Sequence, residues 1–139
     1  MDIRKEFEKT MTNTTTMALA TSVDNIPNVR ILNFVYIIEE KLLYFQSKKG
    51  DKKENEFIKN KFVAFTTIPK DDLAYVRVNG AIVKKSLKTI FDVKEKFVEK
   101  MPFYKDFIEK NGNTMDLYEL QFSKITFFPD PDRFEELNI

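Results

Sequence analysis

The sequence predicts a mainly β fold with helices, in which an antiparallel barrel carries the helices on its outside. Strand-like apolar runs dominate the 139 residues, and they lack the strand–helix–strand rhythm of a parallel sheet. Only 3 glycines are present, too few for a glycine-rich dinucleotide loop. One domain over residues 1–139 is expected, because 42% hydrophobic residues suffice for one core at this length.

The first third of the chain is expected to hold one helix and then a β-meander. Ile3, Phe7 and Met11 recur at intervals of four with charges between them, which predicts an amphipathic helix over residues 2–12. The next segments are apolar and are separated by polar, turn-forming residues. We expect strands at residues 17–22, 29–38 and 42–47, with a hairpin loop at residues 24–28.

The strand expected at residues 29–38 is apolar on both faces except at Arg30 and Asn33. Strands of this kind are covered on both faces, so we expect a central strand with residues 42–47 as its antiparallel partner. An arginine in such a strand is costly to bury without an anion beside it. Arg30 therefore predicts an anionic partner, either a structural carboxylate or a bound phosphate.

A short helix should follow the meander. Asp51 stands three residues before Glu54, the spacing of a capping box, and Phe57 and Ile58 would form the buried side of the helix. Pro102 should split a later helical stretch into two pieces. The remaining elements are strands at residues 62–68 and 74–83, the helical stretch at 88–111, a long strand at 115–128 and a turn at 129–132.

Alternation of side chains is clearest in the strand at residues 74–83. One face would carry Val76, Val78, Gly80 and Ile82, and the other Tyr75, Arg77, Asn79 and Ala81. This pattern predicts a half-buried strand.

Composition excludes several classes of function. The chain has no Cys and no His, so it cannot build a disulfide, a zinc finger, a thiolate nucleophile or a Ser-His-Asp triad. Its formal net charge of +1 gives no general attraction to nucleic acid or to anionic membranes. The N-terminus lacks the apolar core of a signal peptide, and no apolar run is long enough to span a bilayer. A cytoplasmic protein is expected.

The segment most informative about chemistry is Ser47-Lys48-Lys49-Gly50-Asp51-Lys52-Lys53. It places a hydroxyl, a flexible glycine and four ammonium groups where a strand ends and a helix begins. Helix N-termini offer unpaired N–H groups and the positive end of a dipole, and nearby lysines add charge. The segment therefore favours a phosphate site, which Arg30 could join from the neighbouring strand. A solvated turn in a lysine-rich protein is the alternative.

Four segments resemble successive landmarks of the pyridoxamine 5′-phosphate oxidase-like family of split barrels that bind flavin mononucleotide (FMN). Their order and spacing agree over residues 14–86. They are Pro27-Asn28-Val29-Arg30-Ile31-Leu32-Asn33, Tyr44-Phe45-Gln46-Ser47, Gly50-Asp51-Lys52-Lys53 and Val76-Arg77-Val78-Asn79-Gly80-Ala81.

The resemblance implies an antiparallel split β-barrel with peripheral helices that binds FMN as cofactor. It implies a homodimer with the flavin at the subunit interface. The residues placed along the flavin edge would be Arg30, Ile31, Leu32 and Asn33, followed by Gln46 and Ser47. The FMN phosphate would be held by Lys52 and Lys53 together with Arg30. No catalytic side chain and no metal ligand is assigned, because a flavin supplies its own hydride-accepting atom.

The sequence also departs from the family pattern. Asp51 stands where many relatives have Ser at the helix cap, and its charge would weaken phosphate binding unless it turns away to cap the helix. Val35 and Tyr75 stand where the vitamin-B6 oxidases have Lys and Gln, and their C-terminal Trp and Arg signature is missing. Oxidation of pyridoxamine 5′-phosphate is therefore not expected.

Several functions remain open at this point. The first is an FMN-dependent oxidoreductase acting on an unidentified small-molecule substrate or electron donor. The second is a non-catalytic flavin-binding or storage module, and the third is a deazaflavin-dependent reductase or a haem binder, although no His is available as an axial ligand. Single-stranded nucleic acid is a further alternative that the near-zero net charge disfavours. We expect neither a nucleic-acid nor a membrane partner.

Overall fold

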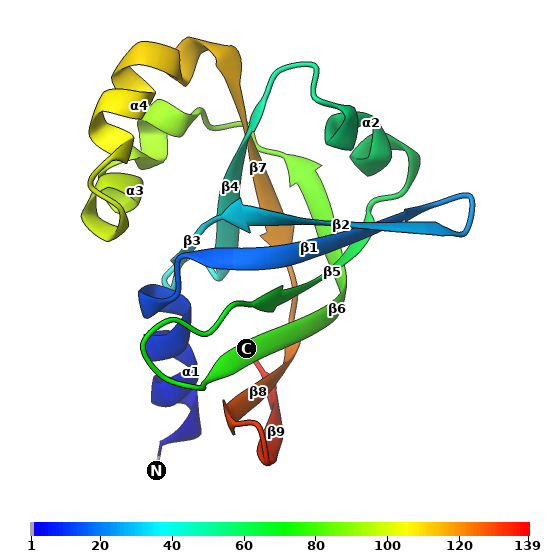
Figure 1. The fold of residues 1–139 in the computed structure, drawn as a ribbon, viewed down its shortest axis with the longest axis vertical. Helices are drawn as coiled ribbons and strands as arrows, with labels where there is room; N and C mark the ends of the chain where they lie inside the picture. Colours follow the sequence, from blue (N-terminus) through cyan, green and yellow to red (C-terminus); the bar gives the residue numbers. More distant parts are fainter. Residues whose placement is uncertain (1) are drawn as a thin grey trace.

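The computed structural model describes residues 2–139, and its strands form one strongly curled antiparallel sheet with four α-helices around it (Figure 1). The fold is therefore mainly β and antiparallel, as predicted. The elements in chain order are α1 Ile3–Asn13, β1 Thr16–Val23, β2 Ile26–Asn33, β3 Val35–Ile37, β4 Leu42–Lys48, α2 Lys52–Lys59, β5 Phe62–Thr67, β6 Tyr75–Lys85, η1 Ile90–Val93, α3 Lys94–Lys100, α4 Tyr104–Asn111, η2 Gly112–Thr114, β7 Met115–Gln121, β8 Lys124–Asp130 and β9 Arg133–Asn138.

The two end strands of the sheet, β2 and β3, are joined in the chain by a single residue. Its strand order is β2-β1-β5-β6-β7-β4-β3, and β8 adds the β8–β9 hairpin next to β6. Because only Phe34 separates β2 from β3, the two ends of this order must meet there. β2 pairs with β1 alone, so its other edge carries no strand partner among residues 2–139. The barrel is split along this edge.

The expectation of one central strand over residues 29–38 was wrong. The chain bends at Phe34, whose N–H donates to the carbonyl of Thr15 and whose carbonyl accepts from Lys100 Nζ at 2.9 Å. Before the bend β2 is an edge strand with exposed apolar side chains, and after it β3 is fully buried. Residues 42–48 accordingly pair with β3 and β7, not with β2.

Two apolar clusters explain which strands are covered on both faces. The first fills the barrel and includes Phe7, Phe45 and Val76. The second lies between the other face of β3, β4 and β7 and the helical stretch, and it includes Tyr44 and Phe97. Tyr44 and Phe45 point to opposite clusters, so β4 is the doubly covered strand.

The local predictions for α2 were partly right. Asp51 caps the helix, because its Oδ1 accepts from the Lys53 N–H at 3.0 Å. The capping box does not form, since the Glu54 carboxylate accepts from Ser47 instead. Phe57 is buried, whereas Ile58 is 82% exposed. Only one apolar side chain therefore holds this short helix to the core.

Two further boundaries differ from the predictions. The strand expected over residues 115–128 is two strands, β7 and β8, which pair with different neighbours. In β6 the alternation changes phase, and the buried residues are Val76, Val78, Ala81 and Val83. The cause is a bulge beside Gly80, whose φ is +70°, where three steps along β6 match two along β5. The helical stretch does break at Pro102, as expected.

No helix within residues 2–139 has the length and apolar character needed to cross a membrane.

Gly80 offers a direct test of the bulge. A Cβ at this position would meet no atom within 4 Å, so a substitution changes only the backbone energy. Gly80→Ala should lower the free energy of unfolding by about 1 kcal/mol, because a left-handed conformation is strained for alanine. Gly80→Asn should lose less, since asparagine adopts this conformation more readily. Urea unfolding measures both, and an alanine variant as stable as the wild type would contradict the bulge.

Candidate functional site

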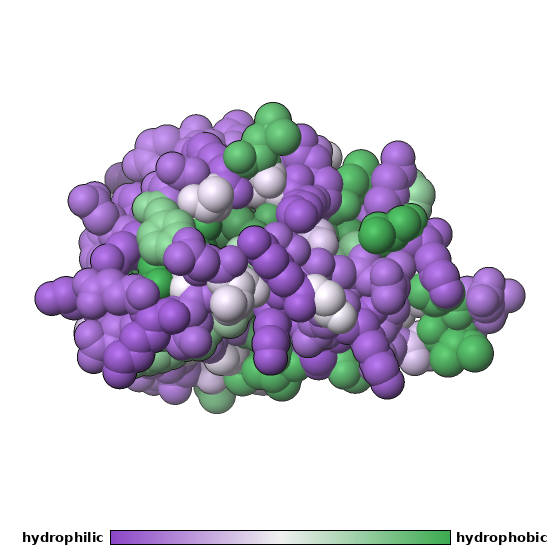
Figure 2. All heavy atoms as spheres, turned by 90° about the horizontal axis from the view of Figure 1, so that it is seen from above, coloured by the Kyte–Doolittle hydropathy of each residue, from purple (hydrophilic) through white to green (hydrophobic). Residues whose placement is uncertain are grey.

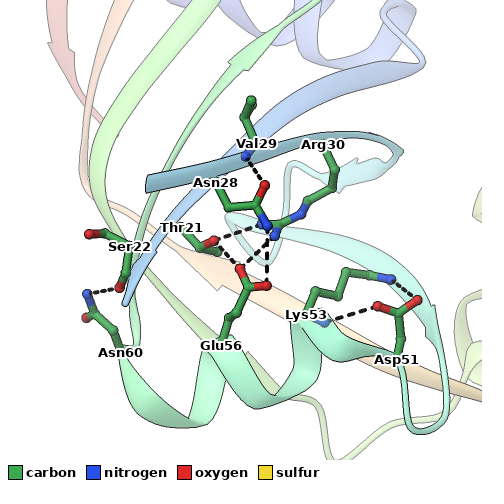
Figure 3. Close-up of polar contacts among 9 residues, drawn as sticks. All are labelled: Thr21, Ser22, Asn28, Val29, Arg30, Asp51, Lys53, Glu56 and Asn60. Atoms are coloured by element: carbon green, nitrogen blue, oxygen red, sulfur yellow. Dashed lines mark hydrogen bonds and ion pairs between the residues drawn. The ribbon is translucent and has the colours of Figure 1, made fainter. Parts of the chain in front are cut away.

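The predicted phosphate site lies where β4 runs into α2, beside the β1–β2 hairpin (Figure 3). Gly50, with φ of +83°, makes the turn between the two elements. At the far end of the helix, Asn60 Nδ2 donates to the carbonyl of Ser22 at 2.9 Å. α2 is thus fixed against the hairpin, and its N-terminus opens toward solvent.

Arg30 reaches α2, but its partner there is a carboxylate. Arg30 Nη2 lies 2.7 Å from Glu56 Oε1, and Arg30 Nη1 donates to Thr21 Oγ1 at 3.1 Å. The Thr21 hydroxyl itself donates to Glu56, and Asn28 Nδ2 does so at 3.4 Å. These donors lower the pKa of Glu56, Thr21 contributing most. Of the two partners expected for Arg30, the structure contains the structural carboxylate, and a phosphate contact stays a prediction.

The lysines of the segment differ in their surroundings. Lys53 Nζ lies 3.2 Å from Asp51 Oδ2, so the cap residue also neutralises the second lysine of the helix (Figure 3). Lys48, Lys49 and Lys52 are exposed, and none of them forms an ion pair in the part of the chain that the structure describes. Cationic capacity for an added anion is therefore concentrated on these three side chains and the helix N-terminus.

Ser47 faces inward. It is buried, and its Oγ donates to Glu54 Oε2 at 2.9 Å. Burial raises the pKa of Glu54, and the nearby Asp116 carboxylate raises it further. Asp116 is balanced by Lys85 Nζ at 3.3 Å. The predicted contribution of Ser47 to a flavin site would thus come from its backbone, while the neighbouring Gln46 remains half-exposed on β4.

The remaining predicted residues, Ile31, Leu32 and Asn33, continue along β2 away from α2. Three steps of a strand separate Asn33 from Arg30, about 10 Å. Asn33 Nδ2 donates to the Tyr104 hydroxyl at 3.1 Å, which places this end of β2 against α4. Figure 1 shows β2 crossing between α2 and the α3–α4 pair. The predicted residues of β2 therefore extend from the lysine-rich junction of β4 and α2 to the aromatic side chains of α4.

Four residues of this site were missed from the sequence, namely Thr21, Asn28, Glu56 and Tyr104. A signal existed for the first two. Asp24 and Asn25 both have positive φ and form a two-residue turn, which pairs Thr21 with Asn28 and Leu19 with Arg30. The predicted loop over residues 24–28 was too long and hid this register. Glu56 and Tyr104 depend on how helices pack, which no local pattern indicates.

The view of the molecule from above, toward the end that carries α2 and the α3–α4 pair, is mainly hydrophilic with separate apolar areas (Figure 2). This surface fits a site for a charged group better than a large apolar docking face.

Comparison with known proteins decides the family. A family model described as "Pyridoxamine 5′-phosphate oxidase-like" matches residues 10–128. The chain belongs to the pyridoxamine 5′-phosphate oxidase-like family. The resemblance found in the sequence is therefore confirmed, and so is the split-barrel fold. A comparison with curated proteins gives no match.

Several solved structures are similar to this chain in fold at low sequence identity. A NimC/NimA family protein from Clostridium acetobutylicum is 21% identical with a TM-score of 0.69, covering 97% of this chain and 92% of that one. An FAD-binding protein from Mesorhizobium loti is 17% identical with a TM-score of 0.64, covering 89% and 90%. HutZ, a haem storage protein from Vibrio cholerae, is 17% identical with a TM-score of 0.68, covering 87% and 90%. The fold is therefore compatible with more than one cofactor.

The ion pair of Glu56 predicts a pH-dependent contribution to stability. At neutral pH, Glu56→Gln should lower the free energy of unfolding by about 1 kcal/mol. The pKa of Glu56 is lower in the folded chain than in the unfolded one. The contribution is therefore complete above the unfolded pKa of about 4.3 and is lost as the pH falls through the folded-state pKa. Urea unfolding should show the difference between the two proteins shrinking as the pH is lowered below the unfolded pKa, and a gap independent of pH would contradict this account.

Proposed function

We propose that this protein is an FMN-binding homodimer that acts as an oxidoreductase on an unidentified small molecule. Membership of the pyridoxamine 5′-phosphate oxidase-like family supports a flavin cofactor, because the family model matches residues 10–128. The structurally similar protein from Mesorhizobium loti binds FAD, which is consistent with a flavin cofactor on this fold. A cytoplasmic location stays a prediction.

The single observation that carries the proposal is the junction of β4 and α2 beside the free edge of β2. A phosphate at this junction would meet the positive end of the α2 dipole and the backbone N–H and exposed side chain of Lys52. The N–H groups of Lys53 and Glu54 already donate to Asp51. Lys53 lies one residue further on, and Lys48 and Lys49 precede the turn. These groups fit a phosphate, although Asp51 and Glu56 add negative charge within the same region.

The free edge of β2 suits the other end of the cofactor. Because β2 pairs only with β1, alternate backbone N–H and C=O groups of residues 30–33 have no strand partner on the other side. A flavin ring carries donors and acceptors along one edge and could pair with such groups. Residues 30–33 of β2 would orient the ring, and Gln46 and Ser47 of β4 would add further contacts to the flavin. Bound FMN would supply the hydride-accepting chemistry.

The outer face of the sheet supports a second copy of the chain as the partner. Ala18, Ala20 and Ala64 line a shallow hollow of about 350 Å³ on this face. Val29, Ile31 and Phe62 are 62%, 60% and 54% exposed, and apolar side chains gathered in this way commonly mark an interaction surface. The family resemblance implies that two such subunits share the flavin groove.

A substrate is not assigned. Val35, at a position where vitamin-B6 oxidases have a lysine, is buried among apolar side chains, and Tyr75 stacks on Phe128 with ring centroids 4.4 Å apart. Neither offers a cationic contact for a second phosphate, so oxidation of pyridoxamine 5′-phosphate is not proposed.

A flavin-binding or storage module without turnover is the second candidate, and it differs from the first by the absence of rapid reduction by a nicotinamide donor. A deazaflavin-dependent reductase is the third candidate. Haem is not proposed, since this chain has no His ligand.

FMN binding should depend on the lysines at the start of α2. Lys52→Gln with Lys53→Gln should weaken FMN binding about tenfold or more, because charge-assisted contacts contribute roughly 1.5–3 kcal/mol each. Riboflavin lacks the phosphate and should bind the variant as it binds the wild type. Fluorescence titration with both flavins measures this. Lys59→Gln, at the other end of α2, is the matched control, and equal weakening of both flavins would contradict the phosphate assignment.

The dimer should depend on the outer face of the sheet. Sedimentation of the wild type should give twice the chain mass of 16.4 kDa. Val29→Asp with Ile31→Asp should give a folded monomer, because two charges would be buried without partners in the interface. A control pair of aspartates at Leu73 and Leu87, exposed residues outside strands β1, β2, β5 and β6, should leave the mass unchanged. A wild-type monomer that binds FMN tightly would refute the shared groove.

A further inference from the structure

Three donors from the β1–β2 hairpin converge on one side chain of α2. The Glu56 carboxylate receives the Arg30 guanidinium at 2.7 Å, the Thr21 hydroxyl and the Asn28 amide at 3.4 Å (Figure 3). Arg30 and Glu56 side chains are only 18% and 22% exposed. The pair is therefore partly shielded from water and is held in place by more than one contact.

A guanidinium, a hydroxyl and an amide are also the donors that a phosphate would use. The Glu56 carboxylate thus lies where the cofactor phosphate would have to lie in order to contact Arg30 in the same way. A phosphate that paired with the Arg30 Nη2 group now bound to Glu56 would have to displace the carboxylate from it. Glu56 would then lie unpaired beside a dianion, which costs both its hydrogen bonds and like-charge repulsion.

We propose that Glu56 sets the phosphate specificity of the flavin site by keeping Arg30 neutralised. The inference rests on the proposed flavin function and refines it. The FMN phosphate is held by Lys52 and the N-terminus of α2, Lys53 reaches it only in competition with Asp51, and Arg30 acts as a structural tie between β2 and α2. The ratio of FMN affinity to riboflavin affinity is consequently smaller than it would be if Arg30 also bound the phosphate.

The test measures the preference for FMN over riboflavin in three proteins. Glu56→Gln keeps the length of the side chain but removes its charge and one of its two acceptor oxygens, which weakens its contact with Arg30 and frees the guanidinium for the phosphate. FMN should bind this variant about tenfold more tightly, the effect of one charge-assisted contact, while riboflavin binding stays unchanged. Asp24→Asn is the control, because it removes one negative charge from the nearby hairpin turn at a residue with positive φ, which asparagine tolerates.

A second variant identifies Arg30 as the source of the gain. Arg30→Ala combined with Glu56→Gln should lose the increase, whereas a gain that persists would overturn the role of Arg30. Glu56→Met replaces Glu56→Gln if the latter does not fold, as judged by circular dichroism, and it should show the same increase. An unchanged FMN preference in a folded Glu56 variant would overturn the inference and leave the flavin function standing. Failure of the wild type to bind either flavin would overturn both.

Discussion

The sheet of this protein depends on the bend at Phe34. Strands β2 and β3 are neighbours in sequence but stand at opposite ends of the sheet order, so the sheet can exist only if it curls until these ends meet. The bend is held from three sides. Phe34 N–H donates to Thr15, its carbonyl accepts from Lys100 Nζ, and its ring packs 3.9 Å from the same ammonium group. The remaining architecture follows from this closure.

Lys100 connects the bend to two other elements. It lies at the end of α3 and also donates to the carbonyl of Met11 near the end of α1, where helix carbonyls lack internal partners. Burial lowers the pKa of Lys100 to about 7, while the two carbonyls favour its ammonium form. One buried side chain therefore ties α1, α3 and the β2–β3 bend, and so keeps the free edge of β2 in a fixed position.

Charge within the candidate site is balanced by acids of the chain itself. Arg30 pairs with Glu56, Lys53 with Asp51 and Lys85 with Asp116. With so many internal acids, the candidate site differs from a simple basic pocket. Selectivity for an anion would come from the exposed lysines and the helix dipole more than from the partly shielded Arg30 guanidinium. The lysine-rich segment was therefore easier to interpret from the sequence than Arg30.

Local patterns predicted the helix over residues 2–12, the β1–β2 hairpin and the break at Pro102, because hydrophobic periodicity and turn-forming residues are properties of neighbouring positions. They failed where a long-range constraint decides. Nothing near Phe34 indicates that it ends a strand, and Gly80 shifts the face of β6 only because β5 runs beside it. For the site, the segment from Ser47 to Lys53 was found through its composition. Glu56 was missed because the choice between a carboxylate and a phosphate for Arg30 depends on how α2 packs against the hairpin.

The central claim is that the split edge between α2 and α4 holds FMN in a dimer. Gel filtration of the protein after mixing with excess FMN, followed by an absorbance spectrum of the protein peak, tests it most directly. The account predicts a dimer-sized peak that carries oxidised flavin bands at about one FMN per chain. A protein peak without flavin absorbance would contradict it.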